Sequence, residues 1–269
     1  MYSSLIDIGA NLAHSSFSDD LSQLIERATL TGVSQIVVTG TSVANSKDSI
    51  RIAGLYPDVC YATAGVHPHE ADTFSAADID SLRGLASNDC VKAIGEAGLD
   101  YNRNYSQRSN QLKAFEAQLT LAAELNMPIF VHERDAADDM LSVLARYRAS
   151  IGKIVVHCFT GAEATLKAYL DLDLYIGITG WICDERRGQH LRELVSLIPS
   201  GRLMLETDSP YLMPRDFPNK KSLQSSRRNE PCTLAHTAAT IASCRGESYE
   251  ELAEHTTRTS RDFFSLPSS

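Results

Sequence analysis

Short apolar runs recur along the chain, and each is followed by a segment with helical periodicity. The runs are rich in Val and Ile and mostly continuous rather than alternating, which is typical of strands buried on both faces of a parallel sheet. We predict strands at Leu5–Gly9, Gln35–Thr39, Tyr61–Val66, Val91–Gly95, Pro128–His132, Lys153–His157, Leu174–Ile178 and Arg202–Glu206.

The segments between these runs have the pattern of amphipathic helices. In NQLKAFEAQLTLAAELNMP, Leu112, Phe115 and Leu119 recur at steps of three and four residues, and the pattern ends at Asn126, before Pro128. An end of this kind, just before a proline, is expected of a helix. A second such segment, DDLSQLIERATLTG, ends in a glycine.

Eight strands that alternate with helices predict an α/β protein with a single (β/α)8 TIM barrel over residues 1–269. A doubly wound open sheet is the alternative. No Gly-rich phosphate loop follows the first strand, and this disfavours a dinucleotide-binding fold.

Composition and charge narrow the class of protein. With 269 residues and 43% hydrophobic residues the chain can bury a large core, and no apolar run approaches the roughly 20 residues of a membrane span. The six cysteines form no C-x-x-C pair, so we expect buried, reduced thiols and a cytoplasmic location. The net charge of −9 excludes a generally basic surface but allows a local basic cleft. A monomer is expected, because no dimerisation element is evident.

Polar residues follow the predicted strands. The carboxyl ends of barrel strands supply catalytic groups, so these residues are the candidates for chemistry. They are Asp7 and Asn11, His67 and His69, Glu96, Asp100 and Arg103, His132 and Arg134, His157, and Glu206 and Asp208.

Two imidazoles and two carboxylates among them predict a divalent metal site. Glu96, His132, His157 and Asp208 are far apart in sequence, and only a barrel would bring them together. Each one alone is more often an ordinary structural residue, and it is their combination that favours a metal. The donor types suit Mg²⁺, Mn²⁺ or Zn²⁺.

Several of these segments together resemble a known family. DIGANL, TAGVHPHEA, AIGEAGLDYNRN, NMPIFVHERDA, HCFTG, YIGITGWICDERRG, ETDSPYLMPRD and SSRRNEP occur in this order over most of the chain. The set is similar to the TatD family of metal-dependent deoxyribonucleases. This resemblance implies an amidohydrolase-type barrel, Mg²⁺ as the activating ion, and hydrolysis of phosphodiester bonds. It further implies 3′→5′ exonuclease activity on single-stranded DNA or RNA and a role in DNA repair after oxidative damage.

The resemblance also implies roles for particular residues. Glu96, His132 and His157 match the metal ligands of the family. Asp208 matches an aspartate that contacts the metal or activates water, and Glu206 in the same ETD motif is a weaker catalytic candidate. His67 matches a histidine that faces the substrate phosphate.

One segment departs from the family pattern. Most members begin with D-x-H-x-H, whose two histidines bind a second metal, whereas this chain has Gly9 and Asn11 at those positions. The Glu96, His132 and His157 site is complete, so we expect at most a weakly held second ion.

The segment after the eighth strand is locally basic. Between positions 215 and 230 it holds five basic and two acidic residues, Lys220 and Lys221 included, in a chain of net charge −9. Arginine can bind phosphate in a bidentate manner, and an aromatic ring can stack on a base. The candidates for substrate binding are His67, Asn11, Arg103, Arg134, Arg227, Arg228 and Trp181.

Two other functions are compatible with these residues. The same barrel and metal could hydrolyse another ester or amide, such as a D-aminoacyl-tRNA. A non-catalytic nucleic-acid-binding barrel is the third hypothesis, and the substitutions at Gly9 and Asn11 are the features that favour it.

Overall fold

The computed structural model describes residues 4–218, 220, 223 and 227–268. Its strands are β1 (Leu5–Ala10), β2 (Val33–Val38), β3 (Cys60–Ala64), β4 (Val91–Asp100), β5 (Ile129–Arg134), β6 (Ile154–Val156), β7 (Tyr175–Ile178) and β8 (Leu203–Leu205). They form one eight-stranded sheet in sequence order, and the pairs that are described run parallel.

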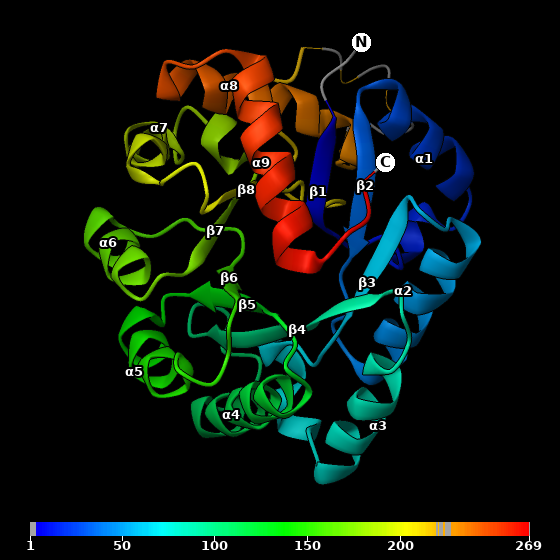
Figure 1. Cartoon of the computed structure of the whole chain (residues 1–269), viewed down its shortest axis with the longest axis vertical. Coiled ribbons are helices and arrows are strands. Elements are labelled where there is room, and N and C mark those ends of the chain that lie inside the picture. Colours follow the sequence, from blue (N-terminus) through cyan, green and yellow to red (C-terminus); the bar gives the residue numbers. More distant parts are fainter. Residues whose placement is uncertain (1–3, 219, 221–222, 224–226, 269) are drawn as a thin grey trace. The chain divides into compact units, whose positions relative to one another are not determined.

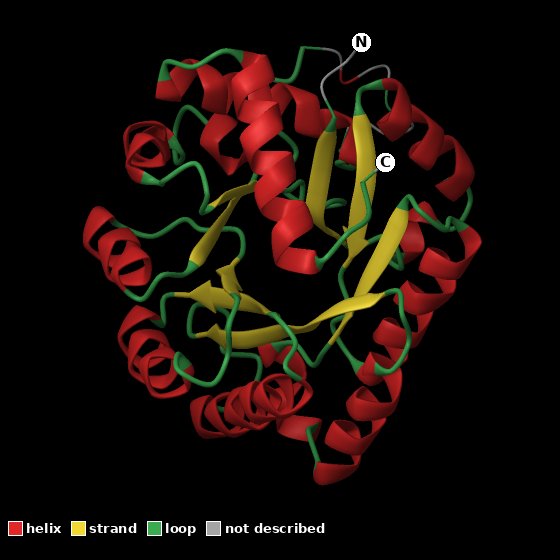
Figure 2. Cartoon of the chain, viewed as in Figure 1, coloured by secondary structure: helices red, strands yellow, loops and turns green. Residues whose placement is uncertain are grey.

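Helices follow the strands along the chain (Figures 1 and 2). They are α1 (Leu21–Leu30), α2 (Val43–Leu55), α3 (Ala76–Ala86), α4 (Arg108–Leu125), α5 (Ala137–Tyr147), α6 (Glu163–Asp171), α7 (Gln189–Leu194), α8 (Leu234–Arg245) and α9 (Tyr249–Phe264). Short 3-10 helices include Ser15–Phe17, Pro68–Thr73, Gly180–Cys183, Val195–Leu197 and Pro231–Thr233. The fold is therefore the predicted (β/α)8 TIM barrel.

Contacts divide the chain into two compact units. The first unit is residues 39–175, with β3 to β6 and α2 to α6. The second unit combines residues 1–38 with 176–269 and contains β1, β2, β8, α1 and α7 to α9. The division falls inside β7. The single hydrolase domain over the whole chain stays a prediction.

The eight strands lie where the apolar runs predicted them, and most ends differ by one or two residues. β4 is the exception, because it continues five residues beyond Gly95 to Asp100. Two glycines interrupt its apolar pattern, so the sequence indicated an earlier end.

The helix ends agree with local sequence signals. α4 ends at Leu125, and Asn126 adopts the left-handed conformation (φ 52°) that asparagine tolerates at a helix end. α9 begins with a capping box, in which Ser248 and Glu251 bind each other's backbone N–H groups.

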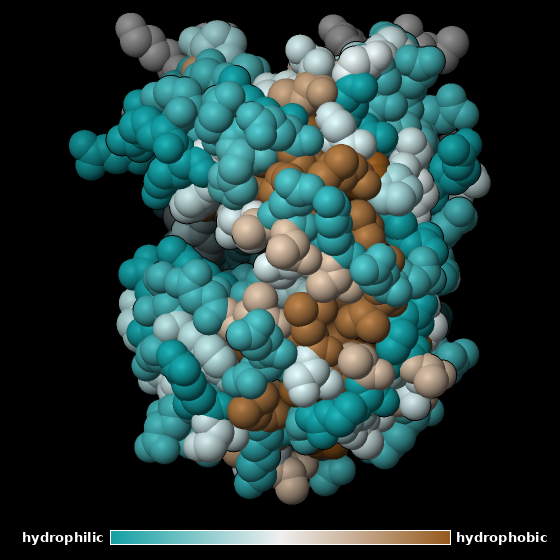
Figure 3. Space-filling model, turned by 90° about the vertical axis from the view of Figure 1, so that its left-hand side faces the viewer, coloured by the Kyte–Doolittle hydropathy of each residue, from teal (hydrophilic) through white to brown (hydrophobic). Residues whose placement is uncertain are grey.

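In the second unit, α9 packs against β1 and β8 (Figure 1). Phe263 and Phe264 near its end are almost completely buried. In the space-filling view most of the visible surface is hydrophilic, with hydrophobic patches between the polar residues (Figure 3). Three of the six cysteines are buried and three are half-buried, so the prediction of buried thiols was correct for Cys60, Cys183 and Cys232 only.

No helix among the described residues is long and apolar enough to cross a membrane.

Candidate metal centre and substrate-binding residues

Three imidazoles surround one carboxylate oxygen in the first unit. His132 Nδ1 and His157 Nε2 each lie 2.8 Å from Glu96 Oε1, and His67 Nε2 lies 3.3 Å from the same atom. Glu96 and His157 are each only 4% exposed. The structure thus brings together three of the four predicted metal ligands, and His67, predicted to contact phosphate, joins the same cluster.

An irregularity in β4 positions Glu96. The pairing of β4 with β5 changes register between Ile94 and Ala97, as in a β-bulge, which redirects a side chain. Gly95 has φ +131°, and a Cβ there would lie 2.3 Å from the carbonyl oxygen of Phe130. At Gly98 (φ +150°), a Cβ would lie 1.9 Å from a carbonyl oxygen of β5. The two glycines of GEAG therefore permit the close strand contact that places Glu96.

A second carboxylate supports the cluster. Asp100 Oδ2 lies 2.8 Å from His69 Nε2 and 3.5 Å from His132 Nε2. Asp100 is 1% exposed and also accepts hydrogen bonds from the backbone of Asn102 and Arg103. Both Asp100 and His69 stood among the polar strand ends, but the sequence did not distinguish them as site residues.

The cluster perturbs the acid strength of its members. Burial alone would raise the pKa of Glu96, but the charges on His157 and His67 and its hydrogen bonds hold this pKa well below its usual range. Burial lowers the pKa of His67 to about 4. Burial would also lower the pKa of His132, yet Asp100 and Glu96 raise it. Of these two imidazoles, His132 therefore binds a proton more readily than His67.

These residues fit a divalent metal. The ligand atoms of His67, Glu96 and His132 all lie within 4.8 Å of one another. His132 Nε2 is buried and, among the residues that the structure describes, makes only the 3.5 Å contact with Asp100 and no hydrogen bond. A cation could take the place of the proton between these nitrogens and Glu96, because metal binding to histidine competes with protonation.

The second unit holds the fourth predicted ligand, Asp208. Asn11 Nδ2 donates a 3.0 Å hydrogen bond to Asp208 Oδ1, and the Asp208 N–H donates to the Gly9 carbonyl at 2.8 Å. Asp208 has φ +54°, a conformation that aspartate tolerates better than most residues. Asn11 and Gly9 thus orient the Asp208 carboxylate and backbone, respectively.

The Asp7 side chain is buried and bonded to Thr207, the residue before Asp208. It is 0% exposed and accepts hydrogen bonds from the Thr207 N–H (2.9 Å), the Thr207 hydroxyl and the Gly9 N–H (3.2 Å). Burial raises its pKa to about 7, against the lowering effect of these bonds. Glu206, a candidate catalytic residue, is also fully buried, and its charge adds to the raised pKa of Asp7.

The predicted substrate-binding residues differ in accessibility. Arg103 is exposed and Arg134 half-buried, and among the described residues neither guanidinium forms an ion pair. Arg227 is exposed. Trp181 is half-buried, and the Arg187 guanidinium lies over its ring at 4.2 Å. Lys221 lies outside the described residues.

Arg228 is held inside the second unit, contrary to the expectation that it binds phosphate. It is 9% exposed and donates to both oxygens of Asp20 at 2.7 Å and to Glu230 Oε1 at 2.7 Å. Arg27 joins the same carboxylates. Two buried carboxylates already neutralise this guanidinium, so we remove Arg228 from the substrate-binding set.

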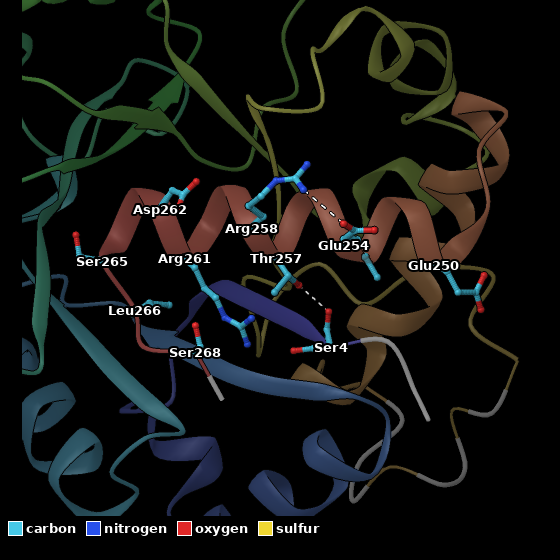
Figure 4. Close-up of a pocket in the computed structure, with 11 residues that line it drawn as sticks. Ser4, Glu250, Glu254, Thr257, Arg258, Arg261, Asp262, Ser265, Leu266 and Ser268 are labelled. Atoms are coloured by element: carbon cyan, nitrogen blue, oxygen red, sulfur yellow. Dashed lines mark hydrogen bonds and ion pairs between the residues drawn. The ribbon is translucent and has the colours of Figure 1, made fainter.

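A cavity lies along α9 (Figure 4). It has a volume of about 940 Å³, and charged residues such as Glu254, Arg258 and Arg261 line it. Thr257 binds the backbone of Ser4 across it. None of the candidate site residues lines this cavity, so it is separate from the chemistry described above.

Comparisons with known proteins show what the whole chain is similar to. The profile of the family described as TatD related DNase matches residues 6–265. A protein from Erwinia amylovora named 3′-5′ ssDNA/RNA exonuclease TatD is 48% identical over 262 residues, which are 97% of this chain and 100% of that protein.

Solved structures are also similar. A hydrolase of the TatD family from Entamoeba histolytica has a TM-score of 0.88 and 27% identity, over 99% of this chain and 100% of that one. A TatD homolog from Escherichia coli K12 has a TM-score of 0.89 and 26% identity over the same shares.

Proposed function

The chain belongs to the TatD-related DNase family, and on this premise we propose that it is a metal-dependent nuclease. It would hydrolyse phosphodiester bonds in single-stranded DNA or RNA, removing nucleotides from the 3′ end. The observation that carries the proposal is the group of three imidazoles around Glu96 Oε1. The name of the Erwinia amylovora relative supports the substrate and polarity.

Glu96, His132 and His157 would hold the ion, with Asp208 as a further ligand. We propose Mg²⁺, as the resemblance implies, although this mixture of nitrogen and oxygen donors suits Mn²⁺ or Zn²⁺ as well. When bound, such an ion lowers the pKa of water and polarises the phosphoryl oxygen. Asp100, through His132 and His69, would keep the imidazoles in position, as carboxylates do behind metal-binding histidines.

Asp208 would act as the general base that accepts a proton from the attacking water. Its hydrogen bond from Asn11 orients the carboxylate, which supports this role. Glu206 is fully buried, so a supporting electrostatic role fits it better than contact with substrate.

Substrate contacts would come from exposed and half-buried groups. Arg103, Arg134 and Arg227 can bind phosphates, and Trp181 offers a ring for base stacking. His67 would contribute either to the ion or to a phosphate, since it lies 3.3 Å from Glu96. We also propose that the protein is a monomer, is located in the cytoplasm and acts in DNA repair.

A labelled oligonucleotide tests this function. We would incubate single strands protected at the 3′ or the 5′ end with the protein and Mg²⁺, and resolve the products by length. We expect a ladder that 3′ protection blocks and that His132→Ala abolishes. His190→Ala, at an exposed position, is the matched control and should leave the ladder intact.

The same assay separates the other hypotheses. Intact oligonucleotide with Mg²⁺, Mn²⁺ and Zn²⁺ would contradict the nuclease. Release of the amino acid from a D-aminoacyl-tRNA would then favour another ester substrate. Retained binding without any turnover, unaffected by His132→Ala, would favour a non-catalytic barrel.

A further inference from the structure

A second group of metal-binding side chains lies in the second unit. Cys183 ends the 3-10 helix Gly180–Cys183, Asp216 lies in the segment after β8, and His236 lies in the first turn of α8. One ligand atom from each lies within 4.8 Å of the other two. None of these residues belongs to the proposed nuclease site.

The three side chains differ in exposure. The Cys183 side chain is fully buried, whereas the His236 and Asp216 side chains are 25% and 45% exposed. His236 Nε2 lies 2.7 Å from Asp216 Oδ1, and Cys183 Sγ donates to Thr240 Oγ1 at 3.4 Å. An ion could therefore approach from solvent through His236 and Asp216 and reach the sulfur behind them.

The Thr237 hydroxyl provides a second, independent observation. Thr237 is 1% exposed, and its Oγ1 has no hydrogen-bond partner among the described residues. This hydroxyl lies close to Cys183. A buried hydroxyl without a partner is unfavourable, and a bound ion, or water on such an ion, would provide the missing partner.

The types of ligand atom in this group favour one kind of ion. Thiolate, imidazole and carboxylate are the ligands of Zn²⁺, and three protein ligands leave a fourth tetrahedral position for water. Mg²⁺ prefers oxygen donors and would bind poorly to a thiolate. We propose that Cys183, Asp216 and His236 form a Zn²⁺ site that is distinct from the Glu96 cluster and independent of the nuclease function.

Binding would release a proton. A cysteine thiol that binds no metal carries its proton at neutral pH. The S–H bond breaks as the sulfur–zinc bond forms, and the proton passes to solvent. About one proton should therefore be released per ion at this site, since thiols bind metals as thiolates.

The site would join three segments of the second unit. Arg215, next to Asp216, pairs with Glu185 at 2.8 Å, and Glu185 lies two residues from Cys183. Zinc would thus reinforce an existing connection between the segment after β8 and the 3-10 helix. The ordinary alternative is an Asp–His ion pair beside a core cysteine.

Cobalt spectroscopy distinguishes a zinc site from an Asp–His ion pair beside a core cysteine. We would use full-length protein carrying Glu96→Gln and His132→Ala, which disable the first cluster, and titrate it with Co²⁺ and then Zn²⁺. We expect one equivalent of Co²⁺, a thiolate-to-cobalt charge-transfer band, and displacement of that band by Zn²⁺. Cys183→Ser should abolish the band, and His236→Gln should weaken Co²⁺ binding at least tenfold.

Two controls keep the outcome interpretable. Cys244→Ser removes a half-buried cysteine of α8 outside the cluster and should leave the band unchanged. If Cys183→Ser does not fold, as judged by circular dichroism, the more exposed Asp216→Asn and His236→Gln variants carry the test. A parent protein without the thiolate band, or a band that His236→Gln leaves unchanged, would overturn the proposal.

Discussion

The carboxylates of Asp7 and Asp100 lie at two different strands, and their partners give them opposite acid strengths. Burial would raise the pKa of Asp100, but the 3.5 Å contact with His132 and the hydrogen bond with His69 hold this pKa well below its usual range. The hydrogen bonds that Asp7 accepts come from neutral groups, and burial raises its pKa to about 7. One carboxylate therefore stays ionised at neutral pH, whereas the other is half protonated.

The raised pKa of Asp7 makes stability depend on pH. Between about pH 4 and pH 7 the folded protein keeps a proton on Asp7 that the unfolded chain has lost, so the free energy of unfolding falls as the pH rises. One pKa unit corresponds to about 1.4 kcal/mol, and the rise from 3.8 to about 7 sets an upper bound of about 4 kcal/mol.

We expect Asp7→Asn to remove this pH-dependent fall in the free energy of unfolding. Asparagine carries no charge, and its amide can still form hydrogen bonds with Thr207. Denaturant unfolding at pH 5 and pH 8, with a chelator present, measures the free energy of unfolding of the variant and of the wild type. The variant should gain stability relative to the wild type at pH 8, and exposed Asp19→Asn should not. An equal difference at both pH values would contradict the assignment.

Two neighbouring arginines show what the sequence does not predict about single residues. Arg227 and Arg228 are both basic residues in a basic segment, yet Arg227 is exposed and Arg228 is enclosed by Asp20 and Glu230. The partner Asp20 lies more than 200 positions away. Such a pair depends on tertiary contacts, and no local pattern distinguishes it from a substrate-binding arginine.

At the scale of elements, apolar runs sufficed to predict all eight strands, because strands buried on both faces need continuous hydrophobic residues. They did not predict the end of β4. Gly95 and Gly98 look like a strand end in the sequence, but their absent side chains allow β5 to approach closely. The sequence marked Glu96 as a candidate ligand, while the bulge that directs its side chain is a property of strand pairing.

Two glycine substitutions test this use of β4. In Gly98→Ala the new Cβ would lie 1.9 Å from the His132 carbonyl oxygen, and we expect a loss of at least about 2–3 kcal/mol in the free energy of unfolding. Gly84→Ala, in α3, meets nothing within 4 Å and should gain up to about 1 kcal/mol. Unfolding by denaturant measures both.

A variant Gly98→Ala as stable as the wild type would show that β4 and β5 are not held at this distance. Metal binding gives a second measurement, since His132 belongs to the strand that the added methyl group would displace. We expect the variant's affinity for the ion to fall with its stability, whereas Gly84→Ala should leave that affinity unchanged.

The whole molecule carries a net charge of −9, so it repels nucleic acid at long range. Under the proposed function, attraction would come from local groups, and we propose Arg103 and Arg134 for this role. The sequence indicated this segregation of charge, but only the structure separated the accessible arginines from the enclosed one. Because each phosphate contact releases counterions, the salt dependence of binding counts these contacts.

We expect the affinity for a single-stranded oligonucleotide to fall as salt rises. In Arg103→Ala/Arg134→Ala the slope of log K against log salt should decrease by about 0.7 for each lost contact. Fluorescence anisotropy at several salt concentrations measures this slope. Arg258→Ala, on α9, is the matched control. Equal slopes in the double variant and the control would remove both arginines from the substrate-binding set.

The division of the chain into two units has a consequence for its synthesis. Residues 39–175 form a contiguous unit, so all the partners for its internal contacts leave the ribosome together. The other unit begins with the first residues and ends with the last. β1 must therefore wait for β8 and α9, which it contacts, to be translated. A nascent chain stopped near residue 175 would hold the three imidazoles and Glu96, while β1, already paired with β2, still lacked β8 and α9.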